Sequence, residues 1–140
     1  MVTVSYNFYH GGSDINFVAL QVFLFQVFED LYTYMKSLNT ILDLRPTRIY
    51  PGHGPVIEDP IPKIQYYISH RQQRERQILQ ALQNTVEPMT VLDLVKKIYA
   101  DVPETLWPAA GVNVEHHLSK LLKEGVIDKE NGYWKIVSKM

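Results

Sequence analysis

The stretch IYPGHGPVI, residues 49–57, contains a single histidine, His53, among two glycines and two prolines. Glycine permits backbone angles that other residues resist and proline fixes its own, so this composition indicates a tight turn. Residues 47–50 have the composition of a strand. We therefore expect a loop at the end of a strand, where proteins often hold a side chain in place for function. The alternative is a polar loop residue bonded to nearby backbone.

Two arginines interrupt the apolar side of a long predicted helix. Arg71 and Arg74 lie on the line from Tyr67 to Ile78 at steps of four, three and four residues, the spacing of one helical face. In one interpretation the helix leaves one core and enters another, with the arginines in the gap. In the other, the guanidinium groups contact phosphate or a domain interface.

A second pair of cations lies on the helix predicted from Val112, where Lys120 and Lys123 are accompanied by Glu115 and Glu124. Proteins that bind duplex DNA usually neutralise several phosphates. This helix is too weakly cationic for that, so we expect no sequence-specific binding of duplex DNA.

Aromatic and histidine side chains in the same half of the chain have ordinary explanations. Tyr133 and Trp134 could stack on the bases of a single strand, but such residues more often anchor a hairpin in a core. His116 and His117 are adjacent on a helix and point about 100° apart, so they cannot bind one metal from the same face. We expect one of them to be partly buried and the other solvated.

The elements that position these residues follow from apolar periodicity and turn signals. Thr90 and Asp93 have the spacing of a capping box, Gly125 is a helix stop, and Asn131-Gly132 is a strong hairpin signal. Three helices followed by a hairpin is the order of a winged helix. The predicted helices cover approximately residues 28–42, 62–83, 90–100 and 112–124.

Length and composition indicate one globular protein with a limited core. The 140 residues hold 14 Lys plus Arg against 15 Asp plus Glu, so total charge favours neither a nucleic-acid tail nor a membrane-surface protein. There is no cysteine, which excludes disulfides, thiolate zinc sites and cysteine nucleophiles. The apolar run 17–28 is too short to span a bilayer, so we expect a buried strand or short helix there.

Four stretches together resemble the metallo-β-lactamase superfamily of hydrolases: FEDLYTYMKSL, RIYPGHGPVI, YISHRQQRERQIL and EHHLSKLLKEGVI. Within it, the chain is most similar to endoribonucleases that carry a C-terminal winged helix. The resemblance implies an α+β fold in three parts. Residues 1–26 form a divergent segment without the native conformation of the superfamily, residues 27–62 a C-terminal remnant of a metallo-β-lactamase αββα domain, and residues 63–140 a linker helix and winged-helix domain. The apolar run before Val27 should lack the sheet neighbours that would satisfy its backbone groups.

The resemblance also implies that His53 is a zinc ligand. The leading motif of the superfamily, His-x-His-x-Asp-His, matches no stretch of this chain, and neither His10 nor Asp14 fits the spacing of the other ligands. A catalytic zinc needs about three protein ligands and an open position for water. Zinc is thus the cofactor of the full-length family, and we expect this chain alone to bind none stoichiometrically and to contain no complete catalytic set.

Two main functions remain open from the sequence. One is part of a zinc hydrolase, by resemblance an endoribonuclease on single-stranded RNA, with this chain inactive alone. The other is a winged-helix module that binds nucleic acid or a protein without catalysis. The predicted nucleic-acid contacts are Arg71, Arg74, Lys120 and Lys123. A third possibility is a truncated or alternatively spliced product with little activity.

We expect an intracellular protein without a membrane partner, and the sequence indicates no oligomeric state. The resemblance implies the mitochondrial matrix, although the first 35 residues contain no Lys or Arg and show no import signal.

Overall fold

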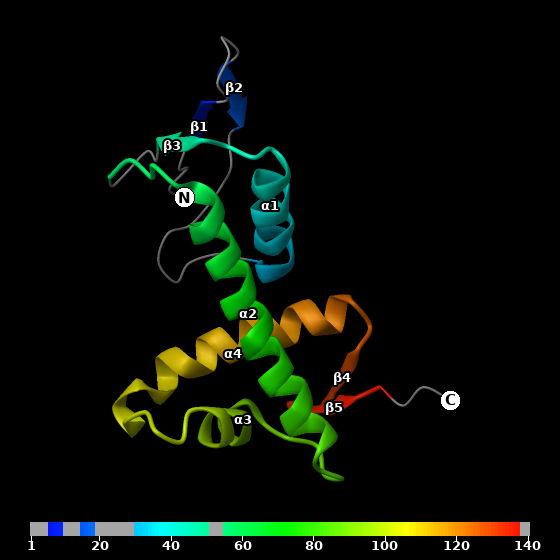
Figure 1. Ribbon diagram of the computed structural model, residues 1–140. Helices are drawn as coiled ribbons and strands as arrows, with labels where there is room; N and C mark the ends of the chain where they lie inside the picture. Colours follow the sequence, from blue (N-terminus) through cyan, green and yellow to red (C-terminus); the bar gives the residue numbers. More distant parts are fainter. Residues whose placement is uncertain (1–5, 10–14, 19–29, 51–54, 138–140) are drawn as a thin grey trace. The chain divides into compact units, whose positions relative to one another are not determined.

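A computed structural model describes residues 6–9, 15–18, 30–50 and 55–137 of the chain (Figure 1). It separates into two units, Met1–Arg71 and Gln72–Met140. Each unit has its own hydrophobic core.

The first unit combines a small antiparallel sheet with helix α1, Leu31–Asp43. The side chain of Asp30 caps this helix by accepting a hydrogen bond from the backbone N–H of Tyr32 at 3.1 Å, so the helix starts slightly later than its apolar periodicity predicts. The sheet contains strands β1 (Tyr6–Tyr9), β2 (Ile15–Val18) and β3 (Arg48–Tyr50). The buried core residues are Leu31, Met35, Leu38, Ile41, Ile49, Ile64 and Ile68.

The N-terminal strands correct one expectation. The apolar run from Phe17 is predicted to lack sheet neighbours, yet its first residues, Phe17 and Val18, belong to β2 and pair antiparallel with β1. Strand β1 also pairs with β3, in the order β2-β1-β3. Strand pairing uses backbone groups, which every residue carries, so a divergent sequence can still occupy this position. The remainder of the apolar run, residues 19–28, lies outside the described residues.

Helix α2, Pro60–Gln83, contributes to both cores. It begins slightly before the predicted start because prolines are tolerated in the first turn of a helix, where their missing N–H groups need no partner. Ile64 and Ile68 belong to the first core, and Ile78 belongs to the second. This agrees with the interpretation of a helix that leaves one core and enters another. No helix in the described part of the chain is long and apolar enough to cross a membrane.

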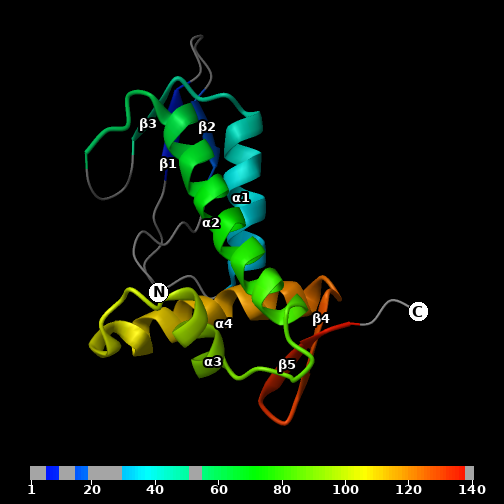
Figure 2. The ribbon, with the colours of Figure 1, turned by 60° about the horizontal axis from the view of Figure 1, so that its bottom comes forward.

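The second unit contains helices α3 (Val91–Ile98) and α4 (Trp107–Lys123), followed by strands β4 (Ile127–Glu130) and β5 (Tyr133–Ile136) (Figure 2). A 3-10 turn, η1 (Glu104–Leu106), precedes α4. The capping box of α3 is confirmed, because Thr90 and Asp93 exchange hydrogen bonds. The core residues include Ile78, Leu82, Leu94, Val95, Val114, Leu118, Leu121, Ile127 and Trp134.

The hairpin is confirmed at Asn131-Gly132, whose φ angles of 50° and 81° are those of a primed turn. A backbone bridge between Met89 and Trp134 adds a short third strand, with N···O distances of 2.9 and 2.8 Å. Trp134 is 4% exposed, so it anchors the hairpin in the core. Tyr133 remains 48% exposed.

Helix α4 starts at Trp107, earlier than the predicted start near Val112, because Pro108 lies in the first turn. It ends at Lys123, just before the predicted stop at Gly125, whose φ is +71°. The N–H of Gly125 donates to the carbonyl of Leu122, and the N–H of Val126 donates to that of Leu121, each at 3.0 Å. These two bonds form a Schellman motif, which turns the chain from α4 into β4.

Replacing Gly125 with Ala should reduce the free energy of unfolding by about 1 kcal/mol, because an L-residue is strained at this positive φ. Nothing lies within 4 Å of the added Cβ, so the cost comes from the backbone. Urea unfolding followed by circular dichroism measures it. Gly111→Ala is the control. Its Cβ meets Val91 at an ordinary 3.7 Å inside a helix, so it should be neutral or stabilising. Equal losses in both variants would contradict this account.

Candidate functional site

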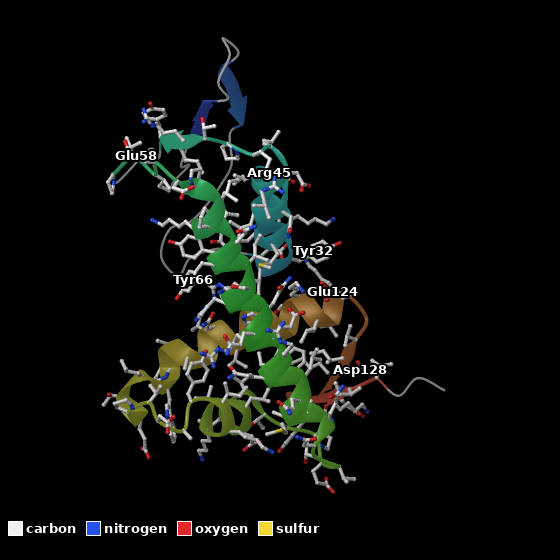
Figure 3. All side chains as sticks on the ribbon, viewed as in Figure 1. Tyr32, Arg45, Glu58, Tyr66, Glu124 and Asp128 are labelled. Carbon is white, nitrogen blue, oxygen red and sulfur yellow. The ribbon has the colours of Figure 1, made fainter. Side chains whose placement is uncertain are left out.

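A polar cluster lies between α2 and α4 inside the second unit, and we call its members Glu75, His117, Lys120 and Glu124 the Glu75 cluster. The Nζ atom of Lys120 is 2.8 Å from Oε2 of Glu75 and 2.8 Å from Oε1 of Glu124. The side chain of Lys120 is only 12% exposed and that of Glu75 is 21% exposed. Figure 3 shows Glu124 at the end of α4. The amine is therefore held by two carboxylates with little access to water.

His117 is the buried member of this cluster. Its side chain is fully buried, and its Nδ1 atom lies 3.9 Å from Oε2 of Glu75. The expectation that the two histidines are partly buried and solvated is wrong, because His117 is completely buried while His116 is half-buried. The signal was present in the sequence. His117 follows Val114 by three residues and precedes Leu121 by four, so it belongs to the apolar face.

The charges of the cluster stabilise one another. Burial by itself raises the pKa of Glu75, but the neighbouring His117 and Lys120 outweigh burial and hold the pKa below its ordinary value of 4.5. Burial lowers the pKa of Lys120, but Glu124 and Glu75 raise it more, so the pKa lies above 10.5. Both groups are therefore charged at neutral pH.

The four predicted nucleic-acid contacts are divided between the two units. Arg71 belongs to the first unit, where its charge lowers the pKa of Tyr34 against the larger effect of burial, which raises it. Arg74, Lys120 and Lys123 belong to the second unit. The guanidinium of Arg74 lies 4.2 Å from the ring centre of Tyr99, a cation–π contact.

These positions differ in how readily a phosphate could reach them. Lys120 is already paired with two carboxylates, so a phosphate would have to displace them. Lys123 is exposed at the end of α4. Nucleic-acid binding by Arg71, Arg74, Lys120 and Lys123 stays a prediction from the sequence.

The predicted metal ligand, His53, lies outside the described residues, as do His10 and Asp14. Within the described ranges, no three His, Asp or Glu side chains gather in a way that could hold a metal ion. The described residues by themselves therefore do not fit a zinc centre.

An exposed ring pair on α2 was not anticipated. The rings of Tyr66 and His70 stack with their centroids 6.0 Å apart and their planes at 29°. Tyr66 is 63% exposed, and His70 is also exposed. The i, i+4 spacing of the two residues in the sequence could have indicated the pair.

The second unit matches a known class of domain. Residues 90–134 match the β-lactamase associated winged helix domain. This range runs from the cap of α3 into β5 and confirms the predicted winged helix. With its helices and small sheets, the chain is an α+β protein.

Several known proteins are similar to this chain over a longer stretch than residues 90–134. A β-lactamase-like protein 2 homolog of Drosophila melanogaster is 63% identical over 100 residues, which are 71% of this chain and 34% of the relative. One of Caenorhabditis elegans is 49% identical over 102 residues, 73% of this chain and 34% of the relative. The atrochrysone carboxyl ACP thioesterase of Aspergillus fumigatus is 54% identical over 56 residues, 40% of this chain and 18% of the relative.

The winged helix and the two animal relatives support a partial β-lactamase-like protein. The chain spans about a third of the length of these animal relatives.

Glu75 and Glu124 both contact Lys120, but we expect their replacement to change the free energy of unfolding by different amounts. Glu75→Gln should lower the free energy of unfolding by about 1–3 kcal/mol, because it leaves a buried amine and imidazole without their shared carboxylate. Glu124→Gln is the matched control. It removes an i, i+4 pair on one helix and should cost less than about 0.5 kcal/mol. Urea unfolding of both variants measures the difference, and equal losses would show that Glu75 has no special role.

The same cluster predicts the pH dependence of stability. The folded pKa of Glu75 lies below its unfolded value, so its contribution is complete above 4.5 and is lost as the pH falls through the folded pKa. The contribution of Lys120 is complete below 10.5 and is lost only as the pH rises through its raised pKa. Unfolding free energies from about pH 7 to about pH 3 should fall less steeply in Glu75→Gln than in the parent. Identical slopes would contradict the prediction.

Proposed function

We propose that the chain is part of a zinc-dependent β-lactamase-like hydrolase that cleaves single-stranded RNA. The observation that carries the proposal is the 63% identity over 100 residues to a β-lactamase-like protein 2 homolog. The match of residues 90–134 to a winged helix associated with β-lactamases supports it. The RNA substrate and the mitochondrial matrix as its location rest on the family resemblance of the sequence.

His53 is the residue of this chain proposed to bind the zinc. The proposal rests on its place in the PGHG stretch. In such enzymes the metal lowers the pKa of a bound water so that hydroxide forms at neutral pH. The other ligands match nothing in this chain, so we expect it to be inactive by itself.

The second unit is better suited to a supporting role than to the recognition of duplex DNA. On α4, Lys120 is paired with Glu75 and Glu124, which leaves few cations for a phosphate backbone. Trp134 is buried and cannot stack on a base. We propose that the winged helix supports the hydrolase or guides a single strand, and that it does not recognise duplex DNA.

A winged helix that binds nucleic acid or a protein without catalysis is the alternative. The two proposals predict different behaviour of His53, because only the hydrolase uses this side chain as a metal ligand. Thioester hydrolysis is a further outcome to examine, since one relative is called an acyl carrier protein thioesterase.

A chimera tests the hydrolase directly. The 100 matching residues of this chain replace their counterparts in the Drosophila melanogaster relative. We expect the chimera to bind zinc and to cleave single-stranded RNA, and the His53→Ala chimera to lose metal and activity. Metal analysis after dialysis, an RNA cleavage assay and a small-thioester assay measure this. A chimera with zinc that cleaves thioester but not RNA would overturn the proposed substrate.

In the isolated chain, by contrast, replacing His53 should have no effect. At about micromolar concentration it should bind no stoichiometric zinc and cleave no RNA, and His53→Ala should change neither, because one imidazole cannot hold the metal against water. Tight zinc that depends on His53 in the isolated chain would mean that other residues complete a site.

A further inference from the structure

The first half of α2 carries an outward face formed by Lys63, Tyr66 and His70. These residues are spaced by three and four positions, so they share one side of the helix. All three are exposed, and Tyr66 most clearly, at 63%. Figure 3 shows Tyr66 on the side of α2 that points away from α1. Ile64 and Ile68 are buried in the first core and so form the opposite side.

This face combines an aromatic platform with positive charge. The rings of Tyr66 and His70 stack with their centroids 6.0 Å apart, and both residues are exposed to solvent. Residues 60–71 contain Lys63 and Arg71 and no acidic residue, although the whole chain has a formal net charge of −1. Lys63 forms no ion pair with any residue in the described ranges. A polyanion could therefore approach it without displacing a carboxylate partner.

The composition of the face favours a nucleic acid over a protein. Among the large hydrophobic residues that α2 exposes in the described structure, Tyr66 stands alone, without aliphatic neighbours. A protein-docking face would place further apolar side chains around such an anchor. A stacked ring pair beside a cation instead suits the exposed face of a base and its phosphate. Bases in a duplex are already stacked on each other, so the partner must be single-stranded.

We propose that this face of α2 binds single-stranded RNA, with a base stacked on Tyr66 and His70 and a phosphate at Lys63. The proposal rests on the proposed function for its choice of RNA. It adds a contact site to the four predicted from the sequence and places it in the first unit rather than on the winged helix.

Fluorescence anisotropy with a labelled single-stranded RNA of about 12 nucleotides tests the site. Tyr66→Ala should weaken binding by about 5-fold to 100-fold, the loss expected for one stacked base. Tyr66→Phe keeps the ring and should bind like the parent. Gln65→Ala is the control, because Gln65 is exposed on the same helix but points about 100° away from Tyr66. Circular dichroism confirms that each variant is folded.

Two further measurements separate stacking from charge. An RNA of the same length with abasic sites should bind the parent and Tyr66→Ala equally, because it offers no base to stack. Lys63→Gln should reduce the slope of log affinity against log salt by about 1.

Three outcomes would overturn the proposal. The first is parent-like RNA binding by Tyr66→Ala, and the second is a loss in Gln65→Ala as large as that in Tyr66→Ala. The third is a change in sedimentation of the RNA-free chain on Tyr66→Ala, which would assign the face to a second copy. Parent-like RNA binding by Tyr66→Ala would leave the proposed hydrolase untouched. Conversely, a zinc-loaded chimera that fails to cleave RNA would overturn the proposed function and leave binding at Tyr66 standing.

Discussion

The second unit depends on satisfying a lysine and a histidine that its packing removes from water. Lys120 and His117 lie on the inner side of α4, and a single carboxylate, Glu75 on α2, interacts with both. Buried polar groups are costly unless they are paired. Apolar side chains alone could pack α2 against α4 in several similar ways. The carboxylate of Glu75, in contrast, reaches Lys120 and His117 only when the two helices are in one position. We infer that the Glu75 cluster makes the contact between α2 and α4 more specific than hydrophobic burial alone would.

Helix α2 meets two different requirements along its length. Its first half packs Ile64 and Ile68 into one core, and its last turns pack Ile78 and Leu82 into another. The polar middle serves neither core, which explains why its apolar periodicity is interrupted. Glu75 is a half-buried residue of this polar stretch and contacts Lys120 within the second unit. A single helix thus carries a structural ion pair on one side and the exposed Tyr66–His70 pair on another.

Features set by neighbouring residues were predictable from the sequence. The capping box of Thr90 and Asp93, the Asn131-Gly132 turn and the Gly125 stop depend only on local backbone chemistry, and all three are confirmed. Features that join distant segments were not predictable. Glu75 and Lys120 are 45 residues apart, and either could have been a solvated surface charge. The bridge between Met89 and Trp134 uses backbone groups, which leave no mark in the sequence. His53 lies outside the described residues, so its role still rests on resemblance.

The placement of the aromatic residues makes the two units optically distinct. The chain has two tryptophans, Trp107 and Trp134, and both belong to the second unit. Trp107 donates its indole N–H to the carbonyl of Val102 at 3.2 Å, and the indole of Trp134 is buried with the Lys129 amine 4.8 Å from its ring centre. The first unit has no indole and must be followed through its tyrosines or its backbone. Intrinsic tryptophan emission therefore reports only on the second unit. It would stay unchanged if the sheet and α1 unfolded independently.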